Sequence, residues 1–522
     1  MNKTTKFVIK VISIIAAIIL IFLSINSLFY IADLTMKCSI IKENEKVSIN
    51  STNFIQVLVL TIIWVTLIYS IYKLVDKIEN KKLLIFVIGF VIVMSYLWII
   101  LAQNPPRADQ LSLVVAAQDL IEENFDSFLP NNYLNIFPFQ LGFVLFLEIA
   151  FSICKNIYFI QFINIICVSV ITFCIYYITK KMFKNDKINK IVLILLSGYF
   201  YLELFTTFIY GNIPGLMFAL LSIVFMTNYF ETRKNSKLIL AIIFIIIANI
   251  LKTNFLIYLI AETFLICIDI VETKKWKNFV IIPILIILLF VSNISIKTFY
   301  ECKTGQEISK GIPKLLWINM GLSYNNTRAN GWYDASTLYF YKKSGYNYQE
   351  AKNIAKNEIR LKLNNFIKNP GQAIKFFKEK ILSQWIEPTH QSIWINIPIG
   401  ENDREINNFL VKSIFEGNLN KLLVWYFKIY QTSIYFLSSI YFIINIRKVN
   451  YKQILLAVIF IGGFLFQLIW EAKSLYTFIF AITLLPYAAN TLQLIFEKID
   501  TKILKKQKLL MTSEKINKNR YK

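Results

Sequence analysis

The sequence predicts an all-α polytopic membrane protein with about 12 transmembrane helices. Of its 522 residues, 56% are hydrophobic and 17% are charged. Several apolar runs reach about 18 residues or more, which is the length that an α-helix needs to cross a bilayer. The formal net charge is +24, and the basic residues gather in short segments between apolar runs, as they do in cytoplasmic loops. We therefore attribute the positive charge to topology and to contact with the lipid bilayer, and expect no nucleic acid partner.

Twelve segments are predicted to span the bilayer, with boundaries that a sequence fixes only to within a few residues. They are residues 7–32, 53–75, 83–102, 157–179, 190–209, 213–230, 237–251, 254–271, 278–297, 422–446, 453–470 and 475–495. An even number of spans places both termini on one side, and the basic loops then fall together on the cytoplasmic face. The first span follows a basic stretch, but its apolar run is too long for a cleaved signal peptide. We expect a multi-pass protein of a bacterial cell membrane with both termini cytoplasmic.

The segment at 137–154 is apolar enough to be counted as a further span. Counting it would place the lysine-rich loop at 180–190 outside and invert every later basic loop. Polar residues, a glycine and Pro138 also interrupt its apolar pattern. We therefore predict a short interfacial or re-entrant helix here. The alternative is an ordinary span, with an odd number of spans elsewhere.

The spans divide the chain into five parts. These are two extra N-terminal transmembrane helices at 1–82, a transmembrane core at 83–297 with a large outer loop at 103–156, an extracytoplasmic domain at 298–421, C-terminal transmembrane helices at 422–496, and a basic cytoplasmic tail at 497–522. Turns that contain glycine and proline, together with a helical pattern from Tyr348 to Leu363, predict a small α-rich extracytoplasmic domain.

The outer loop after the third span concentrates charged residues. Pro105-Pro106 ends the preceding helix, because proline cannot continue it. An amphipathic pattern from Asp109 onward predicts a juxtamembrane helix on the outer surface. Asp109 is placed to accept a proton from a hydroxyl group as a general base, and alternatively it caps the surface helix. Arg107 could keep this carboxylate ionised or contact a substrate, and Gln110 is assigned to the same substrate-binding group.

More acids follow in this loop. They are Asp119, Glu122, Glu123 and Asp126. We expect them to form the solvated face of the surface helix, although one of them could bind a divalent cation. The sequence indicates no other cofactor. One histidine and six cysteines without CxxC spacing give no pattern for a zinc site.

Five further residues are candidates for substrate contacts. Lys252 interrupts a nearly continuous apolar stretch at the outer boundary, where it could hold a phosphate group or merely extend its charge into water. Glu471 and Lys473 occupy an outer turn between the last two spans, where they could neutralise each other or present Lys473 to a phosphate. Tyr476 follows this turn. His390, the only histidine, is either a polar substrate contact or a buried structural residue.

These features, taken together and in this order, resemble the GT-C integral-membrane glycosyltransferases. That superfamily includes protein O-mannosyltransferases and bacterial aminoarabinose transferases. The resemblance covers most of the chain from Leu83 to Pro486, and it rests on several motifs. They are Asp109 in the first large outer loop, the surface helix after it, Phe137-Pro138-Phe139-Gln140, the YGNIPG turn, Lys252 and the run GGFLFQLIWEAKSLY, which is similar to Gram-positive members.

The resemblance implies a GT-C-like fold that moves a sugar from a polyprenyl-phosphate donor to an extracytoplasmic acceptor, with inversion. Asp109 matches the catalytic acid of the family, and Lys252 and Lys473 fall at outer positions suited to the donor phosphate. The chain departs from the family in its two extra N-terminal spans and in having a single acid where protein mannosyltransferases have an Asp-Glu pair. We therefore expect a cell-envelope glycan, polymer or lipid as acceptor.

Two other functions fit the sequence. One is a transporter or flippase for lipid-linked sugars, and the other is an envelope polysaccharide polymerase or ligase. The clustering of charged residues in outer loops, and not inside spans, argues against a transporter, whose translocation path needs polar groups within the membrane.

Overall fold

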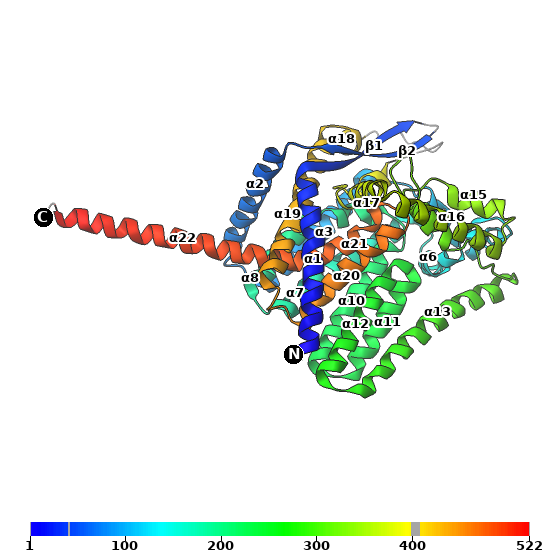
Figure 1. Ribbon diagram of the computed structural model, residues 1–522, viewed down its shortest axis with the longest axis horizontal. Helices are drawn as coiled ribbons and strands as arrows, with labels where there is room; N and C mark the ends of the chain where they lie inside the picture. The colour runs from blue at the N-terminus through cyan, green and yellow to red at the C-terminus, as the bar shows by residue number, and fades with distance from the viewer. Residues whose placement is uncertain (1, 40–41, 398–407, 521–522) are drawn as a thin grey trace.

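The computed structural model describes residues 2–39, 42–397 and 408–520 (Figure 1). Almost all elements in this part of the chain are helices, and the only strands among them form one two-stranded antiparallel sheet. Nine helical segments of the described chain are long and apolar enough to cross a membrane, or up to eleven if each of two bent helix pairs is one span. The chain is therefore an α-helical polytopic membrane protein, as predicted.

The nine apolar segments match nine of the twelve predicted spans. They are α1 (Lys3–Phe29), α2 (Phe54–Leu74), α3 (Asn80–Ala102), α7 (Ile157–Phe183), α10 (Asn212–Thr232), Thr253–Thr273 with α12 (Leu256–Thr273), Trp276–Thr304 with α13 (Ile281–Thr304), α20 (Tyr451–Ile469), and Ser474–Lys505, which includes α21 (Phe478–Ala481) and the start of α22 (Leu485–Arg520).

The other three predicted spans are also helical, but each departs from a straight apolar helix. The span at 190–209 is α8 (Asp186–Ser197) followed by Tyr201–Thr207, which contains α9 (Tyr201–Leu204), with a 41° bend. The span at 237–251 is α11 (Asn235–Leu251), which has 17 residues. The span at 422–446 lies in α19 (Asn418–Asn445), which is 28 residues long but not among the strongly apolar helices. The expected number of twelve thus exceeds the nine to eleven that the described chain supports.

The segment at 137–154 contains α6 (Leu141–Ile153), which does not continue straight from the helix before it. Asp126–Ile136, which ends in α5 (Tyr133–Ile136), meets Pro138–Ile153 at an angle of 93°. Gln140 at the start of α6 donates a hydrogen bond to Tyr210, and Lys155 after its end lies 3.2 Å from Glu122. Glu122 follows α4 (Asp109–Ile121), whose Gln110 binds the chain next to Tyr210. Both ends of α6 therefore contact segments of the predicted outer loops, and the bend fits either the predicted re-entrant helix or a broken span.

The loops gather at two ends of the helix bundle, and the predicted cytoplasmic loops share one of them, which we call the basic end. Contacts there join segments far apart in the chain. They are Asn2 with Glu272 (2.8 Å), Lys73 with Asp500 (2.8 Å), Lys187 with Glu497 (3.0 Å), and Arg233 with Asp269 (2.6 Å). The predicted outer loops meet at the other end, which we call the site end. Their contacts include Ala32 N with Ile386 O (3.3 Å), Ile312 N with Ile136 O (3.0 Å), and Ala472 N with Gly331 O (2.7 Å).

The site end carries a small helical domain, which we call the outer domain because its segment lies between predicted outer boundaries. It also carries a β-hairpin, which the sequence analysis did not predict. The domain contains α14 (Leu315–Gly321), α15 (Ser336–Lys343), α16 (Tyr348–Lys368) and α17 (Pro370–Trp385), and α18 (Phe409–Glu416) precedes α19. Figure 1 shows α15, α16 and α17 together on one side of this end, with the hairpin of β1 (Tyr30–Ser39) and β2 (Lys42–Ser51) above α17.

The hairpin begins where the first predicted span was expected to continue to residue 32. α1 ends at Phe29, and the ammonium group of Lys428 in α19 donates hydrogen bonds to Ser27 O (2.9 Å) and Tyr30 O (2.7 Å). A cation at a helix C-terminus stabilises the free carbonyl groups there. Burial alternates along β2, where Glu45 and Val47 are buried. The acidic residue at a buried position hides the period-2 apolar pattern by which a strand is recognised.

Candidate active site

Asp109 begins α4 at the site end of the bundle. The preceding residue, Ala108, is the N-cap and has a positive φ of 47°, and no side-chain cap hydrogen bond occurs there among the described residues. The Asp109 side chain is exposed and contacts the hydroxyl group of Tyr133 in α5. Asp109 lies in the first turn of α4, where an acid interacts favourably with the helix dipole, so this geometry accommodates both its alternative role at the helix N-terminus and a role as proton acceptor.

Asp109 belongs to a cluster of charged side chains from distant parts of the chain. Its carboxylate interacts electrostatically with Lys252, Glu471 and Lys473. Glu45 and Arg328 extend the group, because both also interact with Lys473. We call these six residues the Asp109 cluster. Its members come from the hairpin, α4, the turn after α11, the outer domain and the turn after α20.

Lys252 is held at the end of α11 against an aromatic ring. Its ammonium nitrogen lies 3.8 Å from the centroid of the Tyr210 ring, which is a cation–π contact. Gly211 makes this approach possible, because a Cβ atom there would lie 2.1 Å from Leu251 O. Burial lowers the pKa of Lys252 to about 8, although Asp109 and Glu471 act in the opposite direction. Lys252 therefore changes charge near neutral pH.

The turn from Trp470 to Lys473 is fixed by the outer domain. Ala472 N donates to Gly331 O (2.7 Å), and Gly331 adopts a φ of +75° that favours glycine. The buried ammonium group of Lys380 donates to Trp470 O (2.7 Å), Leu468 O (3.0 Å) and Gly321 O. Lys380 thereby satisfies the free carbonyl groups at the end of α20. This arrangement orients Lys473 before any ligand is bound.

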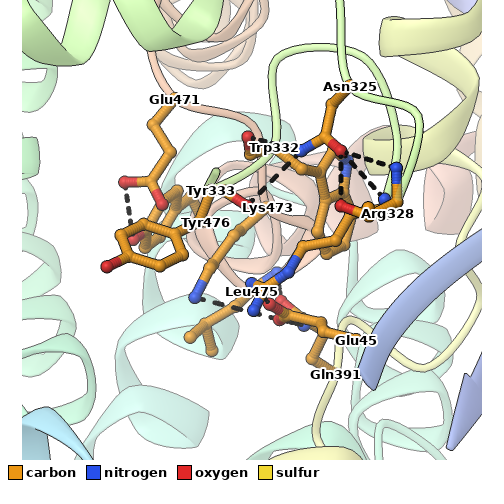
Figure 2. A network of polar contacts seen from close by, with 11 residues as sticks. Glu45, Asn325, Arg328, Trp332, Tyr333, Gln391, Glu471, Lys473, Leu475 and Tyr476 are labelled. Carbon is orange, nitrogen blue, oxygen red and sulfur yellow. Dashed lines mark hydrogen bonds and ion pairs between the residues drawn. The ribbon is translucent and has the colours of Figure 1, made fainter. Parts of the chain in front are cut away.

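Tyr476 lies beside Glu471 and Lys473, which are two members of the cluster (Figure 2). The Tyr476 hydroxyl group lies 3.5 Å from Glu471 Oε2. Burial raises the pKa of Glu471 to about 7, while Lys473 and Lys252 oppose the rise. Burial would lower the pKa of Lys473, but the nearby carboxylates of Glu45, Glu471 and Asp109 outweigh it and raise that pKa. Lys473 therefore stays charged, whereas Glu471 titrates near neutral pH.

Glu45 is the member of the cluster that sequence reasoning missed. Its side chain is only 1% exposed, and it forms ion pairs with Arg328 and with Lys473 (3.8 Å). Gln391 Nε2 donates a hydrogen bond to Glu45 (2.5 Å), as Figure 2 shows. Arg328 is presented by a turn in which Asn325 Oδ1 accepts a hydrogen bond from the Arg328 backbone (3.0 Å). A lone acid in a short polar segment gives no signal of such a tertiary role.

Three residues that were assigned to substrate binding contact other parts of the protein: Gln110, His390 and Arg107. Gln110 is buried, and its carbonyl oxygen accepts a hydrogen bond from Ile209 N (2.8 Å). His390 is 1% exposed, and its Nδ1 lies 2.9 Å from Thr477 Oγ1. Burial lowers the pKa of His390 to about 3, so the ring is neutral. Gln110 and His390 are therefore held by protein groups beside the cluster, as in the structural alternative stated for His390, and their substrate-binding role stays a prediction.

Arg107 is directed toward the segment before α18. Its guanidinium group donates to Trp394 O (2.6 Å) and Ile395 O (3.3 Å) and lies 4.1 Å from the Trp394 ring centroid. These contacts hold the start of the outer loop against the outer domain. Its predicted roles toward a substrate or toward the Asp109 carboxylate stay predictions.

The described residues include no group of three or more His, Cys, Asp or Glu side chains that could hold a metal ion. Of the acids after Asp109, Glu122 pairs with Lys155 at 3.2 Å on the surface. The Asp109 cluster itself combines three acids with three cations. It can bind an anion through Lys252 and Lys473 and can accept a proton on a carboxylate.

Comparisons of the chain with protein-family models, curated proteins and solved structures give no match. The function is therefore argued from the geometry of the cluster and from the surfaces that adjoin it.

Proposed function

We propose that this protein is a membrane glycosyltransferase that moves a sugar from a polyprenyl-phosphate donor to an acceptor at the outer face of the membrane. The observation that carries the proposal is the meeting of Asp109, Lys252 and Lys473 in one cluster. These residues are far apart in sequence and come from three different turns. A carboxylate beside two lysines offers a proton acceptor next to an anion site, which is what transfer from a sugar phosphate requires.

The donor phosphate would be held by Lys252 and Lys473. Both ammonium groups face Asp109 closely enough to interact electrostatically with it. A lysine acts on a phosphate as a point charge and needs no fixed bidentate geometry. A bound phosphate would favour the charged form of Lys252, whose pKa burial has lowered to about 8. Donor binding would therefore be accompanied by proton uptake.

A groove beside Lys252 supports a lipid-borne donor. It has a volume of about 510 Å³ and lies between α6, the end of α11 and α13. Asn249 and Thr253, which flank Lys252, belong to its wall, and Phe139, Ile250 and Ile296 give it apolar surface. α13 itself is largely exposed along its apolar length. A polyprenyl chain could lie in this groove with its phosphate at Lys252, since buried apolar area stabilises such a complex.

The transfer would use Asp109 as general base. The acceptor hydroxyl oxygen forms a bond to the anomeric carbon while the bond from that carbon to the phosphate oxygen breaks. The hydroxyl proton passes to Asp109, and the phosphate leaves with the bonding electrons. Lys252 and Lys473 would stabilise the negative charge that grows on the phosphate. A single displacement of this kind inverts the anomeric configuration, because no covalent sugar–enzyme intermediate forms.

A transporter or flippase for lipid-linked sugars is the second candidate, and one observation favours it. Glu203 in α9 is buried, and neither of its carboxylate oxygens has a hydrogen-bond partner in the described part of the chain. Glu262 is also buried, in α12. The expectation that charged residues stay out of the spans is therefore wrong for these two acids. A polymerase or ligase, the third candidate, finds no separate observation in its favour.

Incubation of the purified protein with a panel of polyprenyl-phosphate sugars tests the proposal. We expect loss of one donor and release of polyprenyl phosphate in the presence of an envelope extract as acceptor. A transporter would instead move the donor across a vesicle membrane without consuming it. Movement without consumption for every donor of the panel would replace the proposal with the transporter.

A further inference from the structure

The outer domain has an excess of positive charge that membrane topology does not explain. Between residues 305 and 397 the sequence contains 13 lysines and arginines and six aspartates and glutamates. This segment lies at the site end, opposite the loops of the basic end. The positive-inside rule accounts for basic residues on only one side of a membrane. The basic residues of this segment therefore require another partner.

Part of this charge lines a second groove. The groove has a volume of about 520 Å³ and lies between the hairpin, α17 and the loop at 325–330. Lys375, Lys378 and Arg328 line it, and Lys375 and Lys378 are exposed. Lys378 Nζ lies 5.4 Å from the ring centroid of Tyr30, which forms another part of the wall. Aromatic and cationic groups are thus combined along one cavity.

Among the described residues that line this groove, the one acid is already engaged by protein groups. Glu379 accepts a hydrogen bond from Asn330 (2.7 Å), and its carboxylate lies 4.0 Å from Lys375. An ion pair between exposed side chains at this distance contributes little and is easily exchanged. The groove therefore presents a net positive surface to a ligand.

Arg328 connects this groove to the Asp109 cluster. Its side chain lines the groove and forms the ion pair with Glu45, which in turn lies 3.8 Å from Lys473 (Figure 2). The groove therefore approaches the cluster from the hairpin side. The groove proposed for the donor lipid approaches Lys252 from the side of α13. Two ligands could reach Asp109 from different directions.

We propose that the groove between the hairpin and α17 binds the acceptor, and that the acceptor is an anionic polymer with hydroxyl-bearing units, such as a polyol phosphate. The acceptor role rests on the proposed function, while binding of the polyanion does not. A sugar acceptor must supply a hydroxyl group, and the cationic wall selects for phosphate or carboxylate groups along the same molecule. A polymer is favoured over a membrane surface because the lysines line a cavity between two elements.

Binding of a fluorescent poly(glycerol phosphate) to the purified full-length protein tests the proposal. The test variant is Lys375→Gln/Lys378→Gln, and the matched control is Lys342→Gln/Lys343→Gln, which removes the same charge from the exposed end of α15. Because the test variant loses two cations of the groove, we expect its affinity to fall about tenfold or more. The control should lose less than about threefold, and binding should weaken as salt is added.

Equal losses in the two variants would overturn the proposal, as would equally tight binding of an uncharged dextran of the same length. Competition by anionic lipid vesicles with the same dependence on Lys375 and Lys378 would overturn it too, in favour of a membrane contact. The assay requires no sugar transfer. If the test variant loses binding selectively but the protein consumes no donor, the polymer-binding groove is supported and only the proposed function is refuted.

Discussion

Ion pairs at the two ends of the helix bundle differ in the exposure of their side chains, as one pair from each end shows. At the basic end, Lys187 and Glu497 form an ion pair at 3.0 Å, but their side chains are 55% and 47% exposed. At the site end, Glu45 lies 3.8 Å from Lys473 and is 1% exposed. Exposed pairs are hydrated in every state of the protein, whereas buried ionisable groups lose their hydration and must find partners.

This difference separates a topological role from a chemical one. An exposed pair such as Lys187 and Glu497 needs only to remain in water on one side of the membrane, so its exact partners matter little. The basic end also holds one buried acid, because Asp269 in the pair with Arg233 is 2% exposed. At the site end, burial displaces the pKa values of several groups, among them Lys252, Lys380 and Glu471. Displaced pKa values of clustered, buried groups are typical of functional sites. Substitutions at the two ends should therefore have very different consequences.

The largest effect is expected from Asp109→Asn. The substitution keeps the shape of the side chain and removes the general base, so we expect turnover to fall by about 10²–10⁴-fold. Donor binding and the thermal unfolding midpoint should change little, because Asp109 is exposed. Initial rates of donor loss at saturating donor measure the effect. Near-normal turnover in the folded variant would end the assignment and direct attention to Asp119 and Glu123.

A smaller loss is expected in donor affinity when the cluster lysines are neutralised. Lys252→Gln and Lys473→Gln each remove one charged hydrogen bond to the phosphate, and we expect each to weaken polyprenyl phosphate binding about 10–100-fold. Turnover at saturating donor should be affected less. Calorimetric or fluorescence titration with polyprenyl phosphate measures the affinity. Unchanged affinity in both variants would show that the phosphate binds elsewhere.

The change of donor affinity with pH should be smaller than the loss of affinity in the two lysine variants. Lys252 has a pKa of about 8 and is charged below it, while Glu471 has a pKa of about 7 and is negative above it. Both changes disfavour a phosphate as pH rises, so affinity should fall by up to about tenfold between roughly pH 7 and pH 9. The part of the slope near pH 8 should disappear in Lys252→Gln, whereas the part near pH 7, which belongs to Glu471, should remain. A wild-type profile that rises over this interval would contradict the account of the cluster.

The smallest effect is expected at the basic end. Lys187→Gln removes one exposed ion pair with Glu497, and we expect a change in unfolding free energy of less than about 1 kcal/mol. Donor affinity and turnover should remain as in the wild type. Thermal unfolding and donor loss, measured on the same preparation, check both statements. A loss of turnover comparable to that of Asp109→Asn would remove the contrast between the two ends.

The sequence predicted the helices and four members of the cluster, Asp109, Lys252, Glu471 and Lys473, because both rest on local patterns. A long apolar run predicts a span whichever helices pack against it. Lys252 and Lys473 are conspicuous because they are charges at the borders of such runs. Asp109 follows directly from the Pro-Pro break. Gln110 and His390 are buried, and a sequence does not show whether a polar side chain faces a cavity or the protein interior, because distant segments decide it.

The parts that the sequence did not predict depend on tertiary contacts. Glu45 lies in a short polar stretch, and only its pairing with Arg328 and Lys473 makes it part of the cluster. Lys380 is one of several lysines in α17, and nothing local distinguishes it from its exposed neighbours. Hydropathy alone does not fix the number of spans, for a related reason. α19 buries polar groups such as Lys428 against other helices, so it does not need the hydropathy of a lipid-facing helix.

A structure of the purified protein with a bound polyprenyl phosphate would test the central claim most directly. The account predicts the phosphate between the ammonium groups of Lys252 and Lys473, with the face that carries the sugar directed at Asp109. It also predicts the start of the polyprenyl chain in the groove between α6 and α13. A phosphate bound at the basic end, or held at the site end by neither lysine, would contradict the account.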